Sequence, residues 1–220
     1  MPTIRFIIHV YADVEPIDVG ATFGVLSMAR RIDPGIEMAL VAREAGNVRL
    51  ANGLEIVAPH SLDDCPAGDV LMILGGAAWP EQSKDERTLA FIRSFGARGL
   101  VASVCTGALI VAGAGLLDGK TATTRRHAPR GVDTPLALME TLYPKVRGTE
   151  ARYVDSGPVV TGGGVVLAVD TTLHLIGRFR GHGIAAETAR IIEYPWHPDG
   201  GEFETARPPL AGGEVASRNR

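Results

Sequence analysis

Apolar runs of strand length alternate along the chain with longer amphipathic stretches. The apolar runs lie at 4–10, 35–41, 69–74 and 100–104, and the stretches with helical character lie at 18–30, 85–97 and 107–114. In the first of these helices, Val19, Phe23, Leu26 and Ala29 recur at helical spacing. Strands that alternate with helices in this way are typical of a mostly parallel sheet that carries helices on both faces. We therefore predict an α/β fold of the doubly wound kind.

The remaining segments continue this pattern as far as residue 194. We expect a hairpin with arms at 48–50 and 54–57, a short strand at 121–124, a loop at 125–134, a helix at 136–142, two strands at 152–154 and 159–161, and helices at 166–179 and 184–194. A chain of 220 residues fits one domain of ordinary size. We predict a single domain over 1–194, followed at 195–220 by a Pro- and Gly-rich arm that is extended or disordered.

Charge and composition exclude several classes of function. The net charge is −3 and the basic residues are scattered, so nucleic acid is not an expected partner. The apolar stretches are far shorter than the roughly 20 residues that cross a bilayer, and the N-terminus lacks the features of a signal peptide. The only cysteines, Cys65 and Cys105, provide no disulfide framework. We therefore expect a reduced, cytoplasmic protein with no membrane partner.

The sequence predicts neither a metal nor a nucleotide cofactor. No two of its histidines have the H-E-x-x-H spacing, and there is no cysteine cluster. The glycine run 162–164 lacks the spacing of a dinucleotide-binding loop, and Ala114 stands where a P-loop needs its first glycine. We interpret both segments as tight turns.

Cys105 occupies the junction between a buried strand and a helix. The run 100–104 ends just before it and the helix at 107–114 begins just after it, with Ser103 and Gly107 as small neighbours on either side. This spacing meets the steric requirement of a nucleophile elbow. The N–H groups of such a helix are expected to lower the pKa of the thiol from about 8.5 toward roughly 3.5–7.5. We predict that Cys105 is the nucleophile; the alternative is a buried structural cysteine.

Five segments of the chain resemble the ThiJ/PfpI superfamily. They are Leu-Gly-Gly-Ala at 74–77, Ser-Val-Cys-Thr-Gly-Ala at 103–108, Gly-Leu-Leu-Asp-Gly-Lys-Thr-Ala-Thr-Thr at 115–124, Val-Thr-Gly-Gly-Gly at 160–164 with Asp170, and Ile-Glu-Tyr at 192–194. They occur in family order and span about residues 3–194. The superfamily is related to class I glutamine amidotransferases, so the resemblance implies a flavodoxin-like fold and a homodimer. Cys-Thr-Gly at the elbow and Ile-Asp-Val at 17–19 are similar to its isonitrile (cyclohexyl isocyanide) hydratase branch.

The resemblance implies roles for residues around Cys105. Asp18 would be the catalytic acid and base, although by its position alone it could serve as a helix N-cap. Open α/β folds place their sites at the carboxyl edge of the sheet, and a carboxyl group beside a thiolate has a raised pKa. Thr106 adds a hydroxyl and a backbone N–H next to the nucleophile. The strand-end segment Gly75, Gly76 and Ala77 either supplies N–H groups to an anion-stabilising pocket or forms a simple turn.

The segment after the short strand at 121–124 departs from the superfamily. Members often carry Thr-Thr-His-Trp there, whereas this chain has Thr-Thr-Arg-Arg-His-Ala. Arg125 and Arg126 replace the expected His and Trp, and His127 comes two positions later, which argues against a Cys-His pair. Arg125 and His127 are candidates for the pocket wall, where a guanidinium would favour an anionic or polar ligand. The alternative is a solvated loop.

Three functions are compatible with these features, each with a small-molecule ligand and no cofactor. The first is an isonitrile hydratase-like lyase, in which Cys105 forms a thioimidate and Asp18 moves protons until an N-substituted formamide is released. The second is another cysteine-dependent enzyme, glyoxalase-like or amidase-like. The third is a non-enzymatic oxidation sensor or ligand-binding protein. Some superfamily members are ligand domains of AraC-type regulators, but the residues after Tyr194 are too few for a helix-turn-helix domain, so we do not expect a regulator.

Overall fold

The computed structural model describes residues 2–198, and a seven-stranded sheet forms its centre. Of the expected arm at 195–220, only the first four residues belong to the described part; the rest, 199–220, lies outside it. The strands of the central sheet are β1 (Ile4–His9), β2 (Ile36–Ala42), β5 (His60–Ser61), β6 (Val70–Ile73), β7 (Leu100–Ser103), β10 (Tyr153–Asp155) and β11 (Val159–Gly162). Two smaller pairs are formed by β3 (Gly46–Arg49) with β4 (Glu55–Ala58) and by β8 (Thr121–Ala122) with β9 (Arg147–Gly148).

The order of the strands is β10-β11-β7-β6-β1-β2-β5. All neighbouring pairs are parallel except β10 and β11, which are antiparallel. The long parallel strands β2-β1-β6-β7-β11 therefore follow the flavodoxin-like order, which reverses between β1 and β6. This confirms the predicted fold class.

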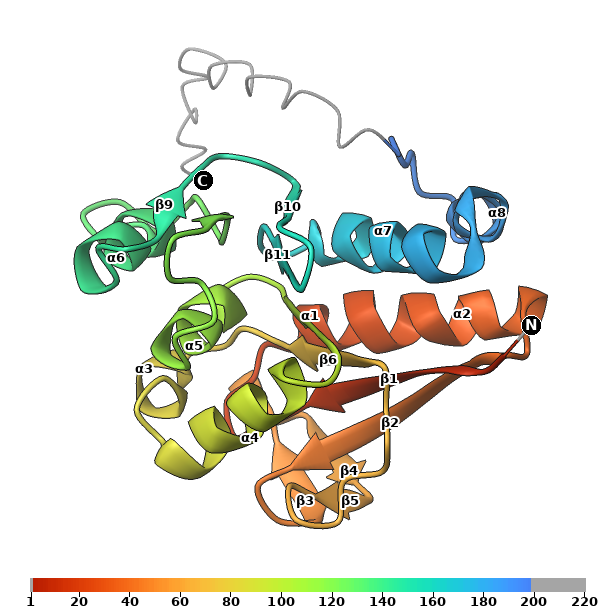
Figure 1. Cartoon of the computed structure of the whole chain (residues 1–220), viewed down its shortest axis with the longest axis horizontal. Helices are drawn as coiled ribbons and strands as arrows, with labels where there is room; N and C mark the ends of the chain where they lie inside the picture. The colour runs from red at the N-terminus through yellow and green to blue at the C-terminus, as the bar shows by residue number, and fades with distance from the viewer. Residues whose placement is uncertain (1, 199–220) are drawn as a thin grey trace, which may run out of the picture.

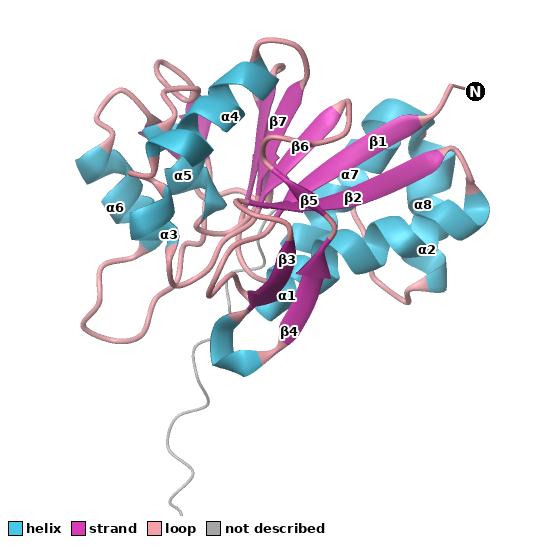
Figure 2. Ribbon diagram, turned by 90° about the horizontal axis from the view of Figure 1, so that it is seen from below, coloured by secondary structure: helices cyan, strands magenta, loops and turns pink. Residues whose placement is uncertain are grey.

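Helices cover both faces of the sheet (Figures 1 and 2). One face carries α1 (Pro16–Val19), α2 (Val25–Ile32), α7 (Ala168–Arg180) and α8 (His182–Ile191). The other face carries α3 (Trp79–Gln82), α4 (Glu86–Gly96) and α5 (Gly107–Gly113), with α6 (Pro135–Leu142) packed on the outer side of α5. The core lies between these layers, where β1, β6 and β7 contribute side chains that are almost all fully buried.

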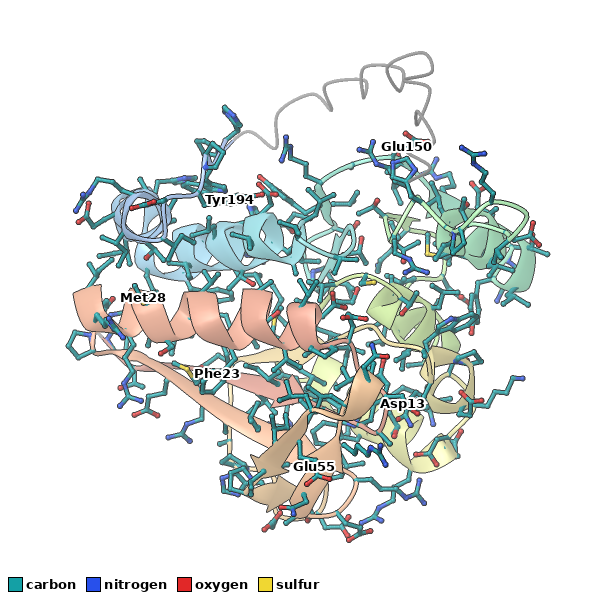
Figure 3. The ribbon with its side chains drawn as sticks, turned by 180° about the vertical axis from the view of Figure 1, so that it is seen from behind. Asp13, Phe23, Met28, Glu55, Glu150 and Tyr194 are labelled. Carbon is teal, nitrogen blue, oxygen red and sulfur yellow. The ribbon has the colours of Figure 1, made fainter. Side chains whose placement is uncertain are left out.

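The first predicted helix contains a widened turn. It begins at Pro16, not at residue 18, and the π-helical segment Gly20–Gly24 joins α1 to α2. Because a π turn adds a residue, it rotates the side chains that follow relative to α-helical spacing. Phe23, labelled in Figure 3, is consequently 37% exposed, whereas Thr22 is fully buried. The α-helical spacing predicted that Phe23 lies on the buried face of the helix with Leu26 and Ala29. This prediction is wrong for Phe23.

Three short elements have no counterpart among the predicted ones, namely α3, β5 and β9. Each has four residues or fewer, which is too short for a periodic pattern in the sequence. The predicted boundaries of the other elements agree with the structure to within a few residues. No helix within residues 2–198 is both long enough and apolar enough to cross a bilayer.

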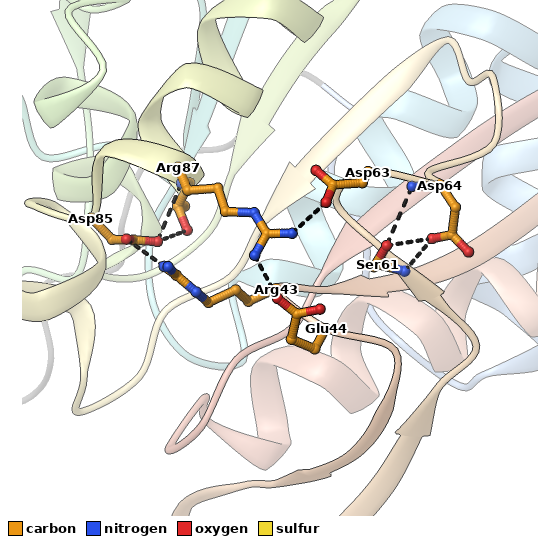
Figure 4. A network of polar contacts seen from close by, with 8 residues as sticks. Arg43, Glu44, Ser61, Asp63, Asp64, Asp85 and Arg87 are labelled. Carbon is orange, nitrogen blue, oxygen red and sulfur yellow. Dashed lines mark hydrogen bonds and ion pairs between the residues drawn. The ribbon is translucent and has the colours of Figure 1, made fainter.

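A network of charged side chains links the β2 edge of the sheet to α4 (Figure 4). Arg87 on α4 donates to Glu44 at 2.5 Å and to Asp63 at 2.6 Å, and Arg43 donates to Asp85 at 2.5 Å. Ion pairs between solvent-exposed side chains contribute little to the stability of a fold. The network therefore orients the connections on this side of the sheet more than it stabilises the fold.

Candidate active site

The carboxyl ends of three neighbouring strands lie at one level. His9 pairs with Ile73 between β1 and β6, and Ile73 pairs with Ser103 between β6 and β7. The segments that follow these strands therefore meet at one edge of the sheet. This edge includes the point between β1 and β6 where the strand order reverses, which is where open α/β folds bind ligands.

Cys105 adopts the backbone conformation of a nucleophile elbow. It follows β7 with a φ of +52°, a left-handed value that costs an L-residue roughly 1–2 kcal/mol. Hydrogen bonds hold this turn: Cys105 N donates to Gly163 O at 3.0 Å, and Thr124 Oγ1 donates to Cys105 O at 2.6 Å. A β-carbon on Gly107 would lie 2.2 Å from the carbonyl oxygen of Ile73. A glycine is therefore needed two residues after the cysteine, because the backbone at position 107 lies against the end of β6.

Asp18 lies beside Cys105, within α1. The N-cap of α1 is Glu15, so the N-cap interpretation of Asp18 is wrong. The Asp18 side chain is fully buried, and its Oδ2 accepts a hydrogen bond from Gly75 N at 2.9 Å. Gly75 also packs against the elbow, because a β-carbon there would come within 2.7 Å of Cys105 Cβ. A glycine at position 75 thus lets the carboxyl group and the thiol approach the same strand end.

Burial and the interaction between the two side chains set the protonation of this pair. Burial raises the pKa of Asp18 from 3.8 to about 7, although the Gly75 N–H and a hydrogen bond with Cys105 lower it. Burial first, and the charge of Asp18 second, raise the pKa of Cys105 to about 12. The Thr106 N–H and Arg125 lower the thiol pKa but do not offset burial. The sequence-based prediction that the helix N-terminus lowers the thiol pKa is therefore wrong, because burial removes the water that would solvate the thiolate.

Near neutral pH these pKa values leave the Cys105 thiol protonated and the Asp18 carboxyl group about half ionised, so the pair holds between one and two protons. When Asp18 is ionised, its carboxylate is the neighbouring group that can accept the thiol proton. When Cys105 attacks an electrophile, its proton passes to Asp18, which can return it to the bound substrate. The pair can therefore work as a nucleophile with its own base and acid.

The N–H groups of the Gly75–Ala77 segment are all engaged within the protein. Gly75 N donates to Asp18, Gly76 N donates to Thr106 Oγ1 at 3.0 Å, and Ala77 N donates to Asp13 O at 3.1 Å. This corrects the expectation that they stabilise an anionic intermediate. The segment instead positions Asp18 and the Thr106 hydroxyl, which also donates to Gly76 O at 3.3 Å.

A cavity of about 210 Å³ opens over the thiol. Five of its lining residues were candidates from the sequence, namely Gly76, Ala77, Cys105, Thr106 and Arg125. The other three, Glu15, Trp79 and Val165, were not singled out by the sequence. Glu15 directly precedes α1, the helix that contains Asp18. Its position three residues before Asp18 was the signal in the sequence that could have placed it near the site. Arg125 reaches the site because Gly164 has no side chain: a β-carbon there would lie 2.8 Å from Arg125 Cβ and 2.9 Å from Cys105 Sγ.

Arg125 and His127 differ in their relation to the thiol. Arg125 lines the cavity over Cys105, so the solvated-loop interpretation does not hold for this side chain. His127 is exposed and lines only a neighbouring cavity of about 530 Å³. The residues lining that second cavity are Arg125, Arg126, His127, Ala128, Pro129, Arg152, Gly164, Val165 and Leu167. The structure thus shows no Cys-His pair at the elbow.

The other candidate groups lie outside this site. Cys65 is in the loop between β5 and β6, where burial raises its pKa and its thiol donates to Pro66 O at 3.4 Å. Within residues 2–198, no three His, Cys, Asp or Glu side chains are grouped closely enough to hold a metal ion. The elbow itself brings together a thiol, a carboxyl group and a guanidinium.

Comparison with known proteins identifies relatives over most of the chain. The sequence profile of the DJ-1/PfpI family matches residues 4–177. The isonitrile hydratase of Pseudomonas putida is 32% identical over 199 residues, which cover 89% of this chain and 82% of that protein. The HTH-type transcriptional regulator GbdR of Pseudomonas aeruginosa is 28% identical over 78% of this chain and 48% of its own length. A crystal structure of a ThiJ/PfpI family protein from Pseudomonas syringae superposes with a TM-score of 0.75 at 27% identity, covering 90% of this chain and 78% of that one.

Proposed function

Because the chain belongs to the DJ-1/PfpI family, as its motifs predicted, we propose that it hydrates an isonitrile to an N-substituted formamide through Cys105. The observation that carries this proposal is the buried Asp18, which Gly75 holds beside a thiol at a strained elbow. Such a pair offers a nucleophile and a proton carrier and nothing that would demand a redox or metal cofactor. The identity of 32% to an isonitrile hydratase supports this choice of reaction.

The first half of the reaction forms a thioimidate. Cys105 Sγ attacks the terminal isonitrile carbon while its proton passes to Asp18. The new C–S bond leaves negative charge on that carbon, and Asp18 returns the proton to it. The product is a thioimidate, Cys105–S–CH=N–R, with Asp18 ionised. Covalent catalysis of this kind divides one difficult addition of water into two easier steps.

The second half of the reaction adds water and regenerates the thiol. Asp18 takes a proton from water, whose hydroxide adds to the thioimidate carbon, and Asp18 then gives that proton to the nitrogen. The C–S bond breaks as the carbonyl forms, and the hydroxyl proton returns to the Cys105–Asp18 pair. The products are the formamide R–NH–CHO and the starting state of the enzyme, so one water is consumed for each isonitrile.

Two neighbouring residues assist these steps in the proposal. Thr106 N–H already contacts Cys105 and lowers its pKa, so it favours the thiolate that leaves in the last step. The Arg125 guanidinium lies in the same cavity and lowers the pKa of both members of the pair. Electrostatic stabilisation of this kind is strongest in a site that excludes water.

The test is formamide production from cyclohexyl isocyanide by the wild type, Cys105→Ala, Asp18→Asn and the matched control Cys65→Ala. We expect product with the wild type and the control, and a loss of at least about 100-fold with the other two variants. Activity that survives Cys105→Ala would overturn the proposal. No product from any isocyanide, with Cys105 still open to alkylation, would redirect the search to glyoxalase-like and amidase-like substrates and to oxidation by peroxide.

Pairing into a homodimer and location in the cytoplasm stay predictions. Sedimentation of the purified protein measures the first, and fractionation of the producing cells measures the second.

A further inference from the structure

The cavity beside the thiol cavity has the form of a second binding compartment. Arg125 and Val165 line both cavities, so the two are neighbours across this pair of residues. Gly164 lines the second cavity and lies between Cys105 Sγ and the aliphatic part of Arg125. Because Gly164 has no side chain, only its backbone stands between them. A small molecule that reacts at Cys105 can therefore extend past Arg125 into the larger space.

Charge in the second cavity is partly neutralised by the protein itself. Arg126 pairs with Glu150 at 3.6 Å, and Glu150 is labelled in Figure 3 on the connection between β9 and β10. Arg152 pairs with the buried Asp170 at 3.3 Å, and Asp170 also accepts a hydrogen bond from Tyr194 at 2.7 Å. These two cations thus have protein anions as counterions.

Arg125 is the exception among the three arginines. It forms no ion pair within 4.0 Å with any residue of 2–198, and its Nε is buried without a hydrogen-bond partner in that part of the chain. A buried donor of a charged group that lacks a partner costs free energy, and a ligand that supplies the acceptor recovers it. Arg125 is therefore the one arginine of the second cavity without an ion pair among residues 2–198, and its charge otherwise acts on the Cys105–Asp18 pair in the thiol cavity.

Apart from the exposed His127, the side chains that complete the wall of the second cavity are apolar. They are Ala128, Pro129, Val165 and Leu167. A ligand that fits combines a short hydrocarbon part with a single negative charge. A guanidinium matches the two oxygens of a carboxylate, and one guanidinium charge balances a carboxylate better than a phosphate dianion.

We propose that Arg125 and the second cavity form a carboxylate subsite, so that the substrate is a small aliphatic isocyanide carrying a carboxylate. The identity of the reacting group rests on the proposed function, whereas the carboxylate subsite rests on Arg125 and the two cavities. This subsite separates the chain from an enzyme that prefers a purely apolar isocyanide.

The test compares γ-isocyanobutyrate with its methyl ester as substrates for the wild type, Arg125→Met, Arg125→Lys and the control Arg130→Met. Arg130 is an exposed residue of the same loop that lines neither cavity. We expect the wild type and the control to prefer the carboxylate. The ratio of kcat/KM values, carboxylate to ester, should fall on the order of 10- to 100-fold in Arg125→Met and less in Arg125→Lys. Because each variant acts on both substrates, the ratio cancels any change in the thiol.

An unchanged ratio in Arg125→Met would overturn the proposal. A phosphonate of the same length that is preferred over the carboxylate would overturn the assignment to a monoanion. If no isocyanide reacts, the proposed hydration fails, but the subsite is still decided by alkylation of Cys105 with iodoacetate and with iodoacetamide. The rate ratio of iodoacetate to iodoacetamide should fall in Arg125→Met and stay at the wild-type value in Arg130→Met; equal ratios in all three proteins would overturn the subsite.

Discussion

Asp18 should make the folded protein less stable as the pH rises, and Asp18→Asn should remove this dependence. The pKa of Asp18 is raised from 3.8 to about 7 in the folded protein, because its buried carboxylate loses solvation. Between these two pH values the folded state binds more protons at this residue than the unfolded state. The free energy of unfolding therefore falls as the pH rises through this window.

The magnitude follows from the two pKa values. One pKa unit corresponds to about 1.36 kcal/mol, so the change from 3.8 to about 7 costs about 4 kcal/mol of stability once the pH exceeds 7. That is a large part of the roughly 5–15 kcal/mol that stabilises an ordinary domain. Ionisation of Cys105 does not affect this measurement. Its pKa is raised from 9.0 to about 12, so it changes the free energy of unfolding only above about pH 9.

The assay is urea unfolding of the wild type and Asp18→Asn at several pH values between 4 and 8. Asparagine has the shape of aspartate and can still accept from Gly75 N, but it carries no charge. The free energy of unfolding of the variant minus that of the wild type should increase by about 4 kcal/mol from pH 4 to pH 8. Asp118→Asn, at a surface carboxylate paired with Lys145, is the control and should give a nearly constant difference.

A difference for Asp18→Asn that does not change with pH would refute this reasoning. It would mean that the carboxylate is well solvated in the folded protein. The role of Asp18 as a proton carrier near neutral pH would then lose its electrostatic basis. The slope decides the question, because any cost of burying the asparagine amide adds the same amount at every pH.

Three other substitutions probe the elbow. Cys105→Gly should be about 1 kcal/mol more stable than Cys105→Ala in thermal unfolding, because only glycine adopts a φ of +52° without strain; equal stabilities would contradict the strained elbow. Gly107→Ala should lower the free energy of unfolding by about 3 kcal/mol or more, since its methyl group would meet the Ile73 carbonyl oxygen at 2.2 Å; a wild-type melting curve would show that the strand end can move. Thr106→Val should reduce kcat roughly 10-fold with little change in KM, because Gly76 loses its acceptor and the segment over the cavity loosens; unchanged kcat would exclude a positioning role.

The sequence carried clear information wherever a local pattern was strong. Long apolar runs predicted the parallel strands, and the small residues around Cys105 predicted the elbow, because both depend on neighbours in the chain. The motif segments also indicated that Asp18 belongs to the site. The packing of Gly164 against Cys105 and Arg125, by contrast, joins segments about 20 to 60 residues apart, and no local pattern records it.

The protonation of the site was the main point at which sequence reasoning failed. A helix N-terminus lowers a thiol pKa, and this rule is local enough to be applied to a sequence. Burial and the charge of Asp18 are properties of the folded environment, and here they outweigh the local effect. The same applies to Gly75 and Gly76, whose N–H groups were available in the sequence but are occupied by Asp18 and Thr106 in the fold.

The order of the elements, the family and the position of the elbow cysteine could therefore be predicted from the sequence alone. These depend on side-chain periodicity, on sterically demanding turns and on short motifs, all of which lie within a few consecutive residues. The proton state of the Cys105–Asp18 pair and the direction of Arg125 became visible only in the folded chain. Both depend on solvent exclusion and on charges brought together from distant segments, and these exist only once the chain has folded.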